Sequence, residues 1–142
     1  FREGLSTDGM WFVIADALRQ AGLDLSTMVR SKHSVDILAK GVSKSALVAD
    51  IIQNDKVDPY EILTMGDQGA WPGNDAALLE HRYSLSVDMP SRRLDRAWKL
   101  APAEKRDVDA TLWYLERMVL EGGGAFRLTL PDARDEGETN SA

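Results

Sequence analysis

The sequence predicts an α/β fold in which a few parallel strands are flanked by helices. Residues 62–65 form a short, uninterrupted apolar run, which is typical of a parallel strand covered on both faces. Amphipathic helical patterns stand before and after this run, from Ser43 to about Gln53 and from Pro102 to about Glu121. A second strand is indicated at residues 83–87, where strand-forming residues alternate. Helices and strands that alternate along the chain favour the α/β class.

Length and composition indicate one soluble, acidic domain. The chain has 142 residues, 44% of them apolar, which is enough for a core. The net charge of −6 argues against a nucleic-acid partner. There is no cysteine, and no apolar run approaches the roughly 18 residues that span a membrane. We therefore expect a cytoplasmic protein without a membrane partner, and, because the chain begins at Phe1, a trimmed or processed product.

The first 38 residues predict a small unit of one helix and two strands. Residues 6–21 have helical periodicity, Ser6 or Thr7 can cap the helix, and Gly22 is placed to end it. The predicted buried face of this helix consists of Trp11, Ile14, Ala15 and Leu18. Short strands are expected near residues 27–30 and 34–38.

The next helix presents a lysine at its start. Ser43 is a good N-cap, which places Lys44 in the first turn. A cation there is mildly unfavourable against the helix dipole, unless an anion binds the free amides and the ammonium together. The alternative is a solvated lysine. The predicted buried side chains of this helix are Ala46, Leu47, Val48 and Ile51.

Two carboxylates are expected to converge beyond the central strand at residues 61–65. Asp67 follows the strand, and Asp75 returns to the same side where a short helix opens at Asn74. Two carboxylates beside a helix start suit a hard cation such as Mg²⁺, which keeps several waters. In the alternative interpretation, Asp67 caps a turn and Asn74 caps the helix.

The C-terminal third predicts a loop, a long helix, a strand and a tail. Arg92, Arg93 and Arg96 lie in an irregular loop, where they either bind a phosphorylated substrate or face solvent. The helix from Pro102 has a predicted buried stripe of Val108, Leu112, Leu115 and Val119, widened by Trp113 and Tyr114. A strand is expected at residues 126–130, and residues 131–142 are polar and acidic enough to predict a disordered tail.

Two segments resemble motifs of the haloacid dehalogenase-like (HAD) hydrolases, a family made up mostly of Mg²⁺-dependent phosphatases. Gly66 and Asp67, then Asn74 and Asp75, then a leucine pair resemble the fourth motif. Residues 38–47, with Lys44 at a helix start, resemble the third motif of members that carry a large cap domain.

This sequence departs from the family pattern in two places. Residues 69–72 lengthen the fourth motif. The first motif, an Asp-x-Asp segment that supplies the nucleophile, is absent; the pair Asp107 and Asp109 falls inside a predicted helix, and we do not assign it that role.

The resemblance implies a fold and a set of roles. Residues 39–130 would be the C-terminal part of a Rossmann-like three-layer core, residues 1–38 the end of a cap, and 131–142 a tail. Lys44 would contact the phosphate and the nucleophile, and Asp67 and Asp75 would hold a weakly bound Mg²⁺. Gly66, Asn74 and Ser43 would support them.

Two functions follow from this resemblance. The chain is part of a phosphatase that is inactive alone because its nucleophile is missing, or it is a non-catalytic binding module that reuses half of the fold. Because the central strand would lack a neighbour, we also expect a homo-oligomer or a partner chain that supplies strands. A phosphorylated small molecule is the expected ligand.

Overall fold

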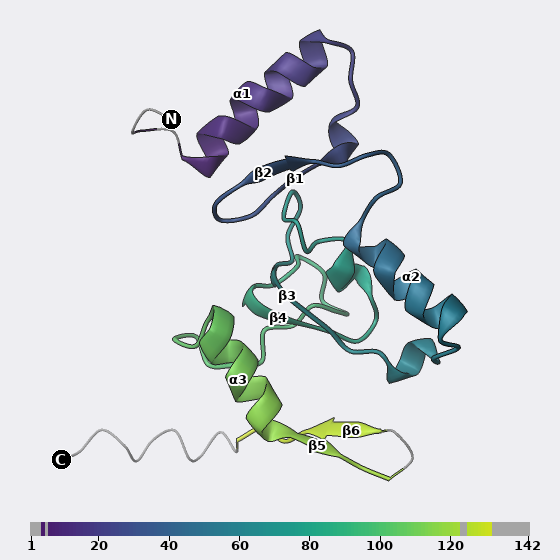
Figure 1. Ribbon diagram of the computed structural model, residues 1–142. Helices are drawn as coiled ribbons and strands as arrows, with labels where there is room; N and C mark the ends of the chain where they lie inside the picture. Colours follow the sequence, from purple (N-terminus) through teal and green to yellow (C-terminus); the bar gives the residue numbers. More distant parts are fainter. Residues whose placement is uncertain (1–3, 5, 123–124, 132–142) are drawn as a thin grey trace, which may run out of the picture.

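The computed structural model describes residues 4, 6–122 and 125–131, and it confirms the mixed α/β class (Figure 1). The helices are α1 (Thr7–Gln20), α2 (Lys44–Asn54) and α3 (Asp107–Arg117). The strands are β1 (Met28–Arg30), β2 (Val35–Ile37), β3 (Thr64–Gln68), β4 (Ser84–Met89), β5 (Met118–Leu120) and β6 (Phe126–Leu128). Short 3-10 helices are η1 (Leu25–Thr27), η2 (Pro59–Glu61) and η3 (Leu78–Glu80). The predicted tail from residue 132 onward lies outside the described residues.

The N-terminal unit forms as the sequence predicts. The side chain of Ser6 caps α1 by accepting a hydrogen bond from the backbone N–H of Gly9 at 3.1 Å. Helix α1 lies along the antiparallel pair β1–β2 (Figure 1). Ala15 is buried on the predicted face of α1, and Met28 of β1 is fully buried.

The central strands β3 and β4 pair in parallel, with Thr64 opposite Ser84 and a register shift between Gly66 and Gln68. Strand β3 begins three residues later than predicted and continues through Asp67. The cause is local, because a capping box between Asp58 and Glu61 holds the preceding residues in η2. Asp67 therefore lies within the strand rather than beyond its end.

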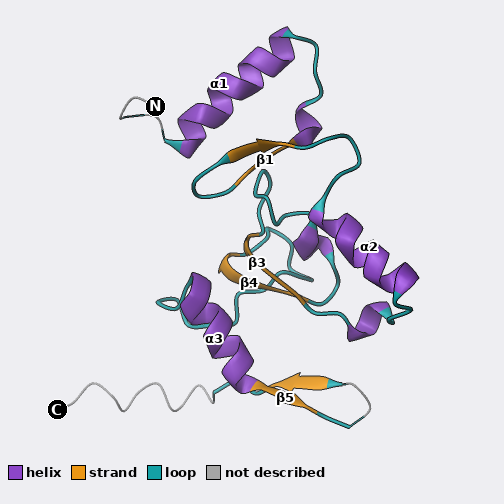
Figure 2. Ribbon diagram, viewed as in Figure 1, coloured by secondary structure: helices purple, strands orange, loops and turns teal. Residues whose placement is uncertain are grey.

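Helices lie on different sides of the parallel pair (Figure 2). Helix α3 packs against β4, whereas α2 packs against η3. Each sheet that the described residues form has two strands, so the larger three-layer core stays a prediction. In α2 only Val48 is buried and Leu47 is exposed, so the predicted buried face was largely wrong.

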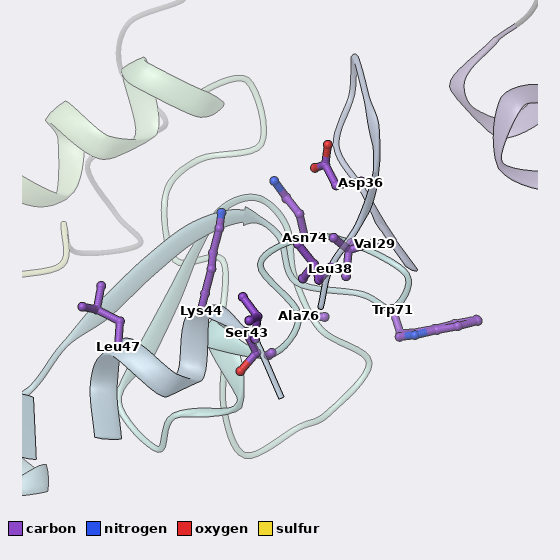
Figure 3. A pocket seen from close by; sticks show the side chains of 12 residues that line it. Val29, Asp36, Leu38, Ser43, Lys44, Leu47, Trp71, Asn74 and Ala76 are labelled. Atoms are coloured by element: carbon purple, nitrogen blue, oxygen red, sulfur yellow. The ribbon is translucent and has the colours of Figure 1, made fainter. Parts of the chain in front are cut away.

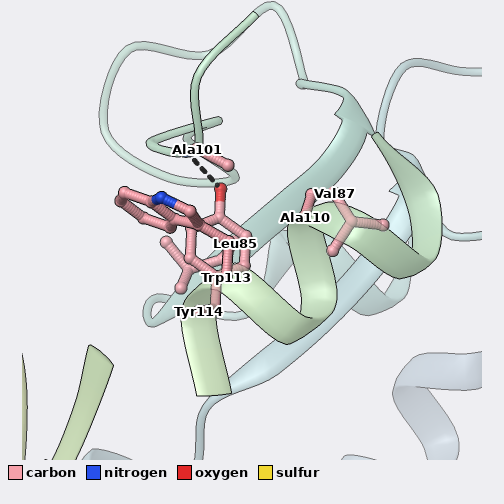
Figure 4. Close-up of a cluster of buried hydrophobic side chains, with 6 residues drawn as sticks. All are labelled: Leu85, Val87, Ala101, Ala110, Trp113 and Tyr114. Atoms are coloured by element: carbon pink, nitrogen blue, oxygen red, sulfur yellow. Dashed lines mark hydrogen bonds between the residues drawn. The ribbon is translucent and has the colours of Figure 1, made fainter. Parts of the chain in front are cut away.

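The main hydrophobic core lies between β4 and α3 (Figure 4). Its buried members are Leu85, Val87, Ala101, Ala110, Trp113 and Tyr114. The hydroxyl of Tyr114 donates to the Ser86 carbonyl oxygen at 2.9 Å and accepts from the N–H groups of Leu100 and Ala101, at 2.8 and 3.1 Å. The core thus joins the strand, the helix and the loop between them.

Helix α3 differs from its prediction in both length and orientation. It runs from Asp107 to Arg117, and the residues after it turn back as the hairpin β5–β6. The predicted stripe is exposed: Val108, Leu112, Leu115 and Val119 are all at least half accessible to solvent. The helix instead turns the face of Ala110, Trp113 and Tyr114 toward β4, because Tyr114 finds backbone partners there.

None of the helices in the described ranges is both long and apolar enough to cross a lipid bilayer.

Candidate functional site

The structure brings Lys44 and Asp75 into contact. Lys44 is the first residue of α2, and its Nζ donates a hydrogen bond to Oδ1 of Asp75. The Asp75 side chain is almost fully buried, whereas that of Lys44 is half exposed. Burial on its own would raise the pKa of Asp75, but hydrogen bonds from Lys44 and from the backbone of Asp67 bring that pKa below its usual value. Asp75 is therefore a buried carboxylate that stays ionised.

Gly66 makes room for the other oxygen of Asp75. That oxygen, Oδ2, accepts hydrogen bonds from the backbone N–H groups of Asp67 at 2.8 Å and Gln68 at 3.4 Å. A Cβ atom on residue 66 would lie 2.7 Å from the same oxygen, which is closer than real Cβ contacts allow. A glycine directly before Asp67 is thus needed for Asp75 to reach the edge of β3.

Asp67 is one third exposed and faces a second lysine. Its Oδ2 lies 3.9 Å from Nζ of Lys32, which is in the turn between β1 and β2. Burial, and after it the neighbouring Asp75 carboxylate, raises the pKa of Asp67. Lys32 also contacts Asp88, at 2.9 Å, and Asp107, at 2.5 Å.

Sequence reasoning missed Lys32 as a partner of Asp67, and missed the two carboxylates Asp88 and Asp107 that contact the same ammonium. Asp88 lies at the end of β4, where the carboxyl ends of parallel strands meet, so its position next to Asp67 could have been inferred. Asp107 was expected inside a helix, but α3 begins at this residue and brings it to the site. Nothing in the local sequence around Lys32 signals its long-range contacts.

The two residues with predicted supporting roles, Ser43 and Asn74, lie at the start of α2 and in the loop after β3. Ser43 occupies the N-cap position of α2, but its hydroxyl bonds to the Ser45 hydroxyl at 2.7 Å rather than to the helix backbone. Ser43 therefore leaves the first-turn amides of α2 without a side-chain cap. The backbone N–H of Asn74 donates to the Arg30 carbonyl oxygen at 2.8 Å, and its side-chain Oδ1 is buried without a hydrogen-bond partner.

The inserted residues 69–72 join the N-terminal unit to the site. The Trp71 ring meets the Trp11 ring edge to face, with 5.8 Å between centroids. Arg30 of β1 donates its backbone N–H to the Pro72 carbonyl oxygen at 2.8 Å, and forms a parallel bridge with Gly73. The lengthened motif thus contacts α1 and β1.

A pocket of about 420 Å³ opens between this N-terminal unit and the start of α2 (Figure 3). Most of its lining is apolar, and Lys44 and Asn74 contribute polar groups. Its other lining residues are Val29, Asp36, Leu38, Val42, Ser43, Leu47, Trp71, Gly73, Ala76 and Ala77. The pocket therefore lies directly beside the pair formed by Lys44 and Asp75.

The arginine loop agrees better with a surface role than with phosphate binding. Arg96 contacts Asp95 at 2.7 Å and Glu80 at 3.4 Å, and Arg93 contacts Asp95 at 3.1 Å. These guanidinium groups are paired with carboxylates, and neither of them lines the pocket beside Lys44.

The acidic residues do not by themselves fit a Mg²⁺ ion. Both oxygens of Asp75 accept hydrogen bonds from N–H groups, and the ammonium of Lys32 lies against Asp67. Across residues 4, 6–122 and 125–131, no group of three or more His, Cys, Asp or Glu side chains could hold a metal ion. An octahedral Mg²⁺ site would need a further carboxylate and a free face on Asp67.

Comparison with known proteins gives one family. Neither a search of curated proteins nor a search of solved structures found a match. The model of the family described as sucrose-6F-phosphate phosphohydrolase matches residues 9–111, a range that includes Lys44, Asp67 and Asp75. The matched range spans most of the chain and covers both motifs that resemble HAD hydrolases, so the chain belongs to the sucrose-6F-phosphate phosphohydrolase family of the HAD superfamily.

Proposed function

We propose that this chain is part of an enzyme that hydrolyses phosphate monoesters, and that it supplies the groups that bind the phosphate and neutralise its charge. The observation that carries the proposal is the contact between Lys44, at the start of α2, and the buried Asp75, within the residues that match the phosphatase family. A lysine held in this way is fixed in position while half of its side chain stays exposed. It can therefore present its remaining N–H donors to an anion.

The start of α2 has the further properties of an anion site. Its first-turn N–H groups have no cap from the Ser43 side chain. The positive end of the helix dipole and the Lys44 ammonium act in the same direction there. We propose that the phosphate group binds at this point, and that the alcohol part of the ester occupies the neighbouring pocket of about 420 Å³. Because the family description names sucrose-6F-phosphate, a sugar phosphate is the first substrate to test.

The nucleophile is proposed to come from outside the described residues, on another segment of the same protein or on a partner chain. The segment or chain that brings the nucleophile would also supply further strands of a three-layer core. It would add a carboxylate that completes a Mg²⁺ site with Asp67. Hydrolysis by this chain alone should therefore stay at background. An assay with sucrose-6F-phosphate and an aryl phosphate in MgCl₂ checks this, and turnover that disappears in Asp67→Asn would contradict it.

Binding of phosphate tests the proposed role of Lys44 separately from turnover. Inorganic phosphate titrated into the labelled chain should shift the NMR signals of the first turn of α2 and of residues 66–75. Lys44→Met should remove these shifts, while Lys40→Met, which removes a charge from an exposed position in the preceding turn, should keep them. Equal shifts in both variants would show that phosphate binds elsewhere.

The alternative is a non-catalytic binding module, and one observation favours it. An exposed apolar face of α3 consists of Val108, Leu112 and Leu115, and Val119 in the following strand β5 is exposed as well. A second copy of the chain or a partner would bury it. If the chain binds no phosphate but self-associates through α3, this alternative replaces the proposal.

A further inference from the structure

We propose that the pocket beside Lys44 receives an apolar group, so that the ligand of this chain is a phosphate ester with a hydrocarbon body rather than a sugar. The inference rests on the proposed function, which places the phosphate at the start of α2, and it adds the chemical class of the alcohol that carries this phosphate. It departs from the family description, which names a sugar phosphate.

Apolar side chains from three parts of the chain line the pocket. Val29 of β1 and Leu38 after β2 come from the N-terminal unit. Leu47 belongs to α2, and Trp71 lies in the loop after β3; Figure 3 shows these two residues at opposite sides of the pocket. The volume of about 420 Å³ falls within the range of small-molecule pockets, which is about 300–1,000 Å³. An organic group of ordinary size therefore fits among these side chains.

Much of this apolar surface is open to solvent. Val42, Leu47 and Trp71 are each more than half exposed, and all three line the pocket. Replacing water beside such side chains with hydrocarbon is favourable, and the gain grows with the apolar area that is covered. A ligand with an apolar body would thus bind more tightly than one that presents hydroxyl groups to the same walls.

The polar side chains in the lining are largely occupied or out of reach. The hydroxyl of Ser43 is bonded to that of Ser45 at 2.7 Å. Asp36 already accepts a hydrogen bond from the Ser34 hydroxyl at 3.3 Å, although its carboxylate keeps room for a further one. Oδ1 of Asn74 is buried, so a ligand in the pocket does not reach it. The lining therefore serves an isolated ligand hydroxyl better than the hydroxyls around a whole sugar ring, because each buried hydroxyl left unpaired weakens binding.

Lys44 sets the direction of the ligand in the pocket. Its Nζ is held by Asp75, and its side chain stays half exposed at the pocket wall. The anionic end of a ligand would lie against this ammonium, and the uncharged body would extend toward Val29, Leu38 and Trp71. The pocket thus suits an amphiphilic anion, which has one charged end and one apolar end.

Two ligands of similar size and equal charge test the proposal: 1-naphthyl phosphate and glucose 6-phosphate. Calorimetric titration should give a dissociation constant at least about tenfold lower for the naphthyl ester, because its rings bury apolar surface that the sugar lacks. Inorganic phosphate should bind about as weakly as the sugar phosphate. NMR shifts of the methyl groups of Val29, Leu38 and Leu47 should place the rings in the pocket.

Leu47→Asn changes the wall of the pocket without disturbing the core, because Leu47 is 62% exposed. The preference for naphthyl phosphate over inorganic phosphate should fall at least about threefold in this variant, since apolar area is lost. Leu47→Met keeps the apolar surface and should retain the preference. The matched control is Leu112→Asn, because Leu112 is a half-exposed leucine of α3 that does not line the pocket, and this variant should also retain the preference.

Equal or tighter binding of glucose 6-phosphate would overturn the proposal, and so would an equal loss of naphthyl phosphate binding in Leu47→Asn and Leu112→Asn. A failure of the proposed function looks different, because inorganic phosphate and both esters would then leave the NMR signals of the first turn of α2 unchanged. The uncharged probe 1-naphthol separates the two cases. Its methyl shifts at Val29 and Leu38 would support the apolar pocket even where no phosphate binds, and their absence would contradict the pocket itself.

Discussion

Removal of the Tyr114 hydroxyl should destabilise the fold far more than removal of one oxygen atom suggests. The side chain is fully buried, and its hydroxyl makes three hydrogen bonds to backbone groups. In Tyr114→Phe the aromatic ring remains against Trp113, so packing is nearly unchanged. What is lost is the partner of the Ser86 carbonyl oxygen and of two N–H groups in the loop that precedes α3.

The size of this effect follows from burial of the three partners. A buried polar group left without a hydrogen bond costs about 1–3 kcal/mol. Ser86 and Ala101 are buried and would bear most of that cost, whereas Leu100 is 38% exposed and can bond to water instead. We therefore expect Tyr114→Phe to lower the free energy of unfolding by about 2–4 kcal/mol.

Urea unfolding followed by tryptophan fluorescence measures this loss, because Trp113 lies next to the altered group. The matched control is Tyr60→Phe, since Tyr60 is 61% exposed and its stability change should stay within about 0.5 kcal/mol. A loss below about 1 kcal/mol in Tyr114→Phe, or one equal to that of the control, would refute the hydrogen-bond argument.

Three further predictions concern the site, the surface and assembly. Gly66→Ala should lower the free energy of unfolding by about 2 kcal/mol, because the new methyl group must displace the Asp75 carboxylate; unchanged urea midpoints would contradict the close approach. The Asp95 carboxyl should stay ionised to a lower pH than an ordinary aspartate, because hydrogen bonds from Arg96 lower its pKa. An NMR titration should show its midpoint rise in Arg96→Met. Light scattering should find a dimer or larger assembly, because β3 pairs only with β4 in the described residues; a monomer at high micromolar concentration would contradict this.

The sequence alone determined the elements whose signals are local. Helix α1 begins where Ser6 can cap it, and β1, β2, β4 and β6 lie within one or two residues of their predicted positions. The Gly-Asp and Asn-Asp pairs carry the resemblance to the family whose model matches the chain. These features depend on backbone propensity, capping and short-range spacing, which a sequence displays directly.

Tertiary structure decided what depends on partners distant in the sequence. Helix α3 contains two apolar faces, and only its packing on β4 selects Tyr114 over Leu112 for burial. Lys32 is separated from Asp107 by 75 positions, so no local pattern could indicate that the two side chains pair. The role of the inserted loop became visible only through the contact of Trp71 with Trp11. Burial and ion pairing are decided by which surfaces meet, and that is a property of the folded chain rather than of any segment.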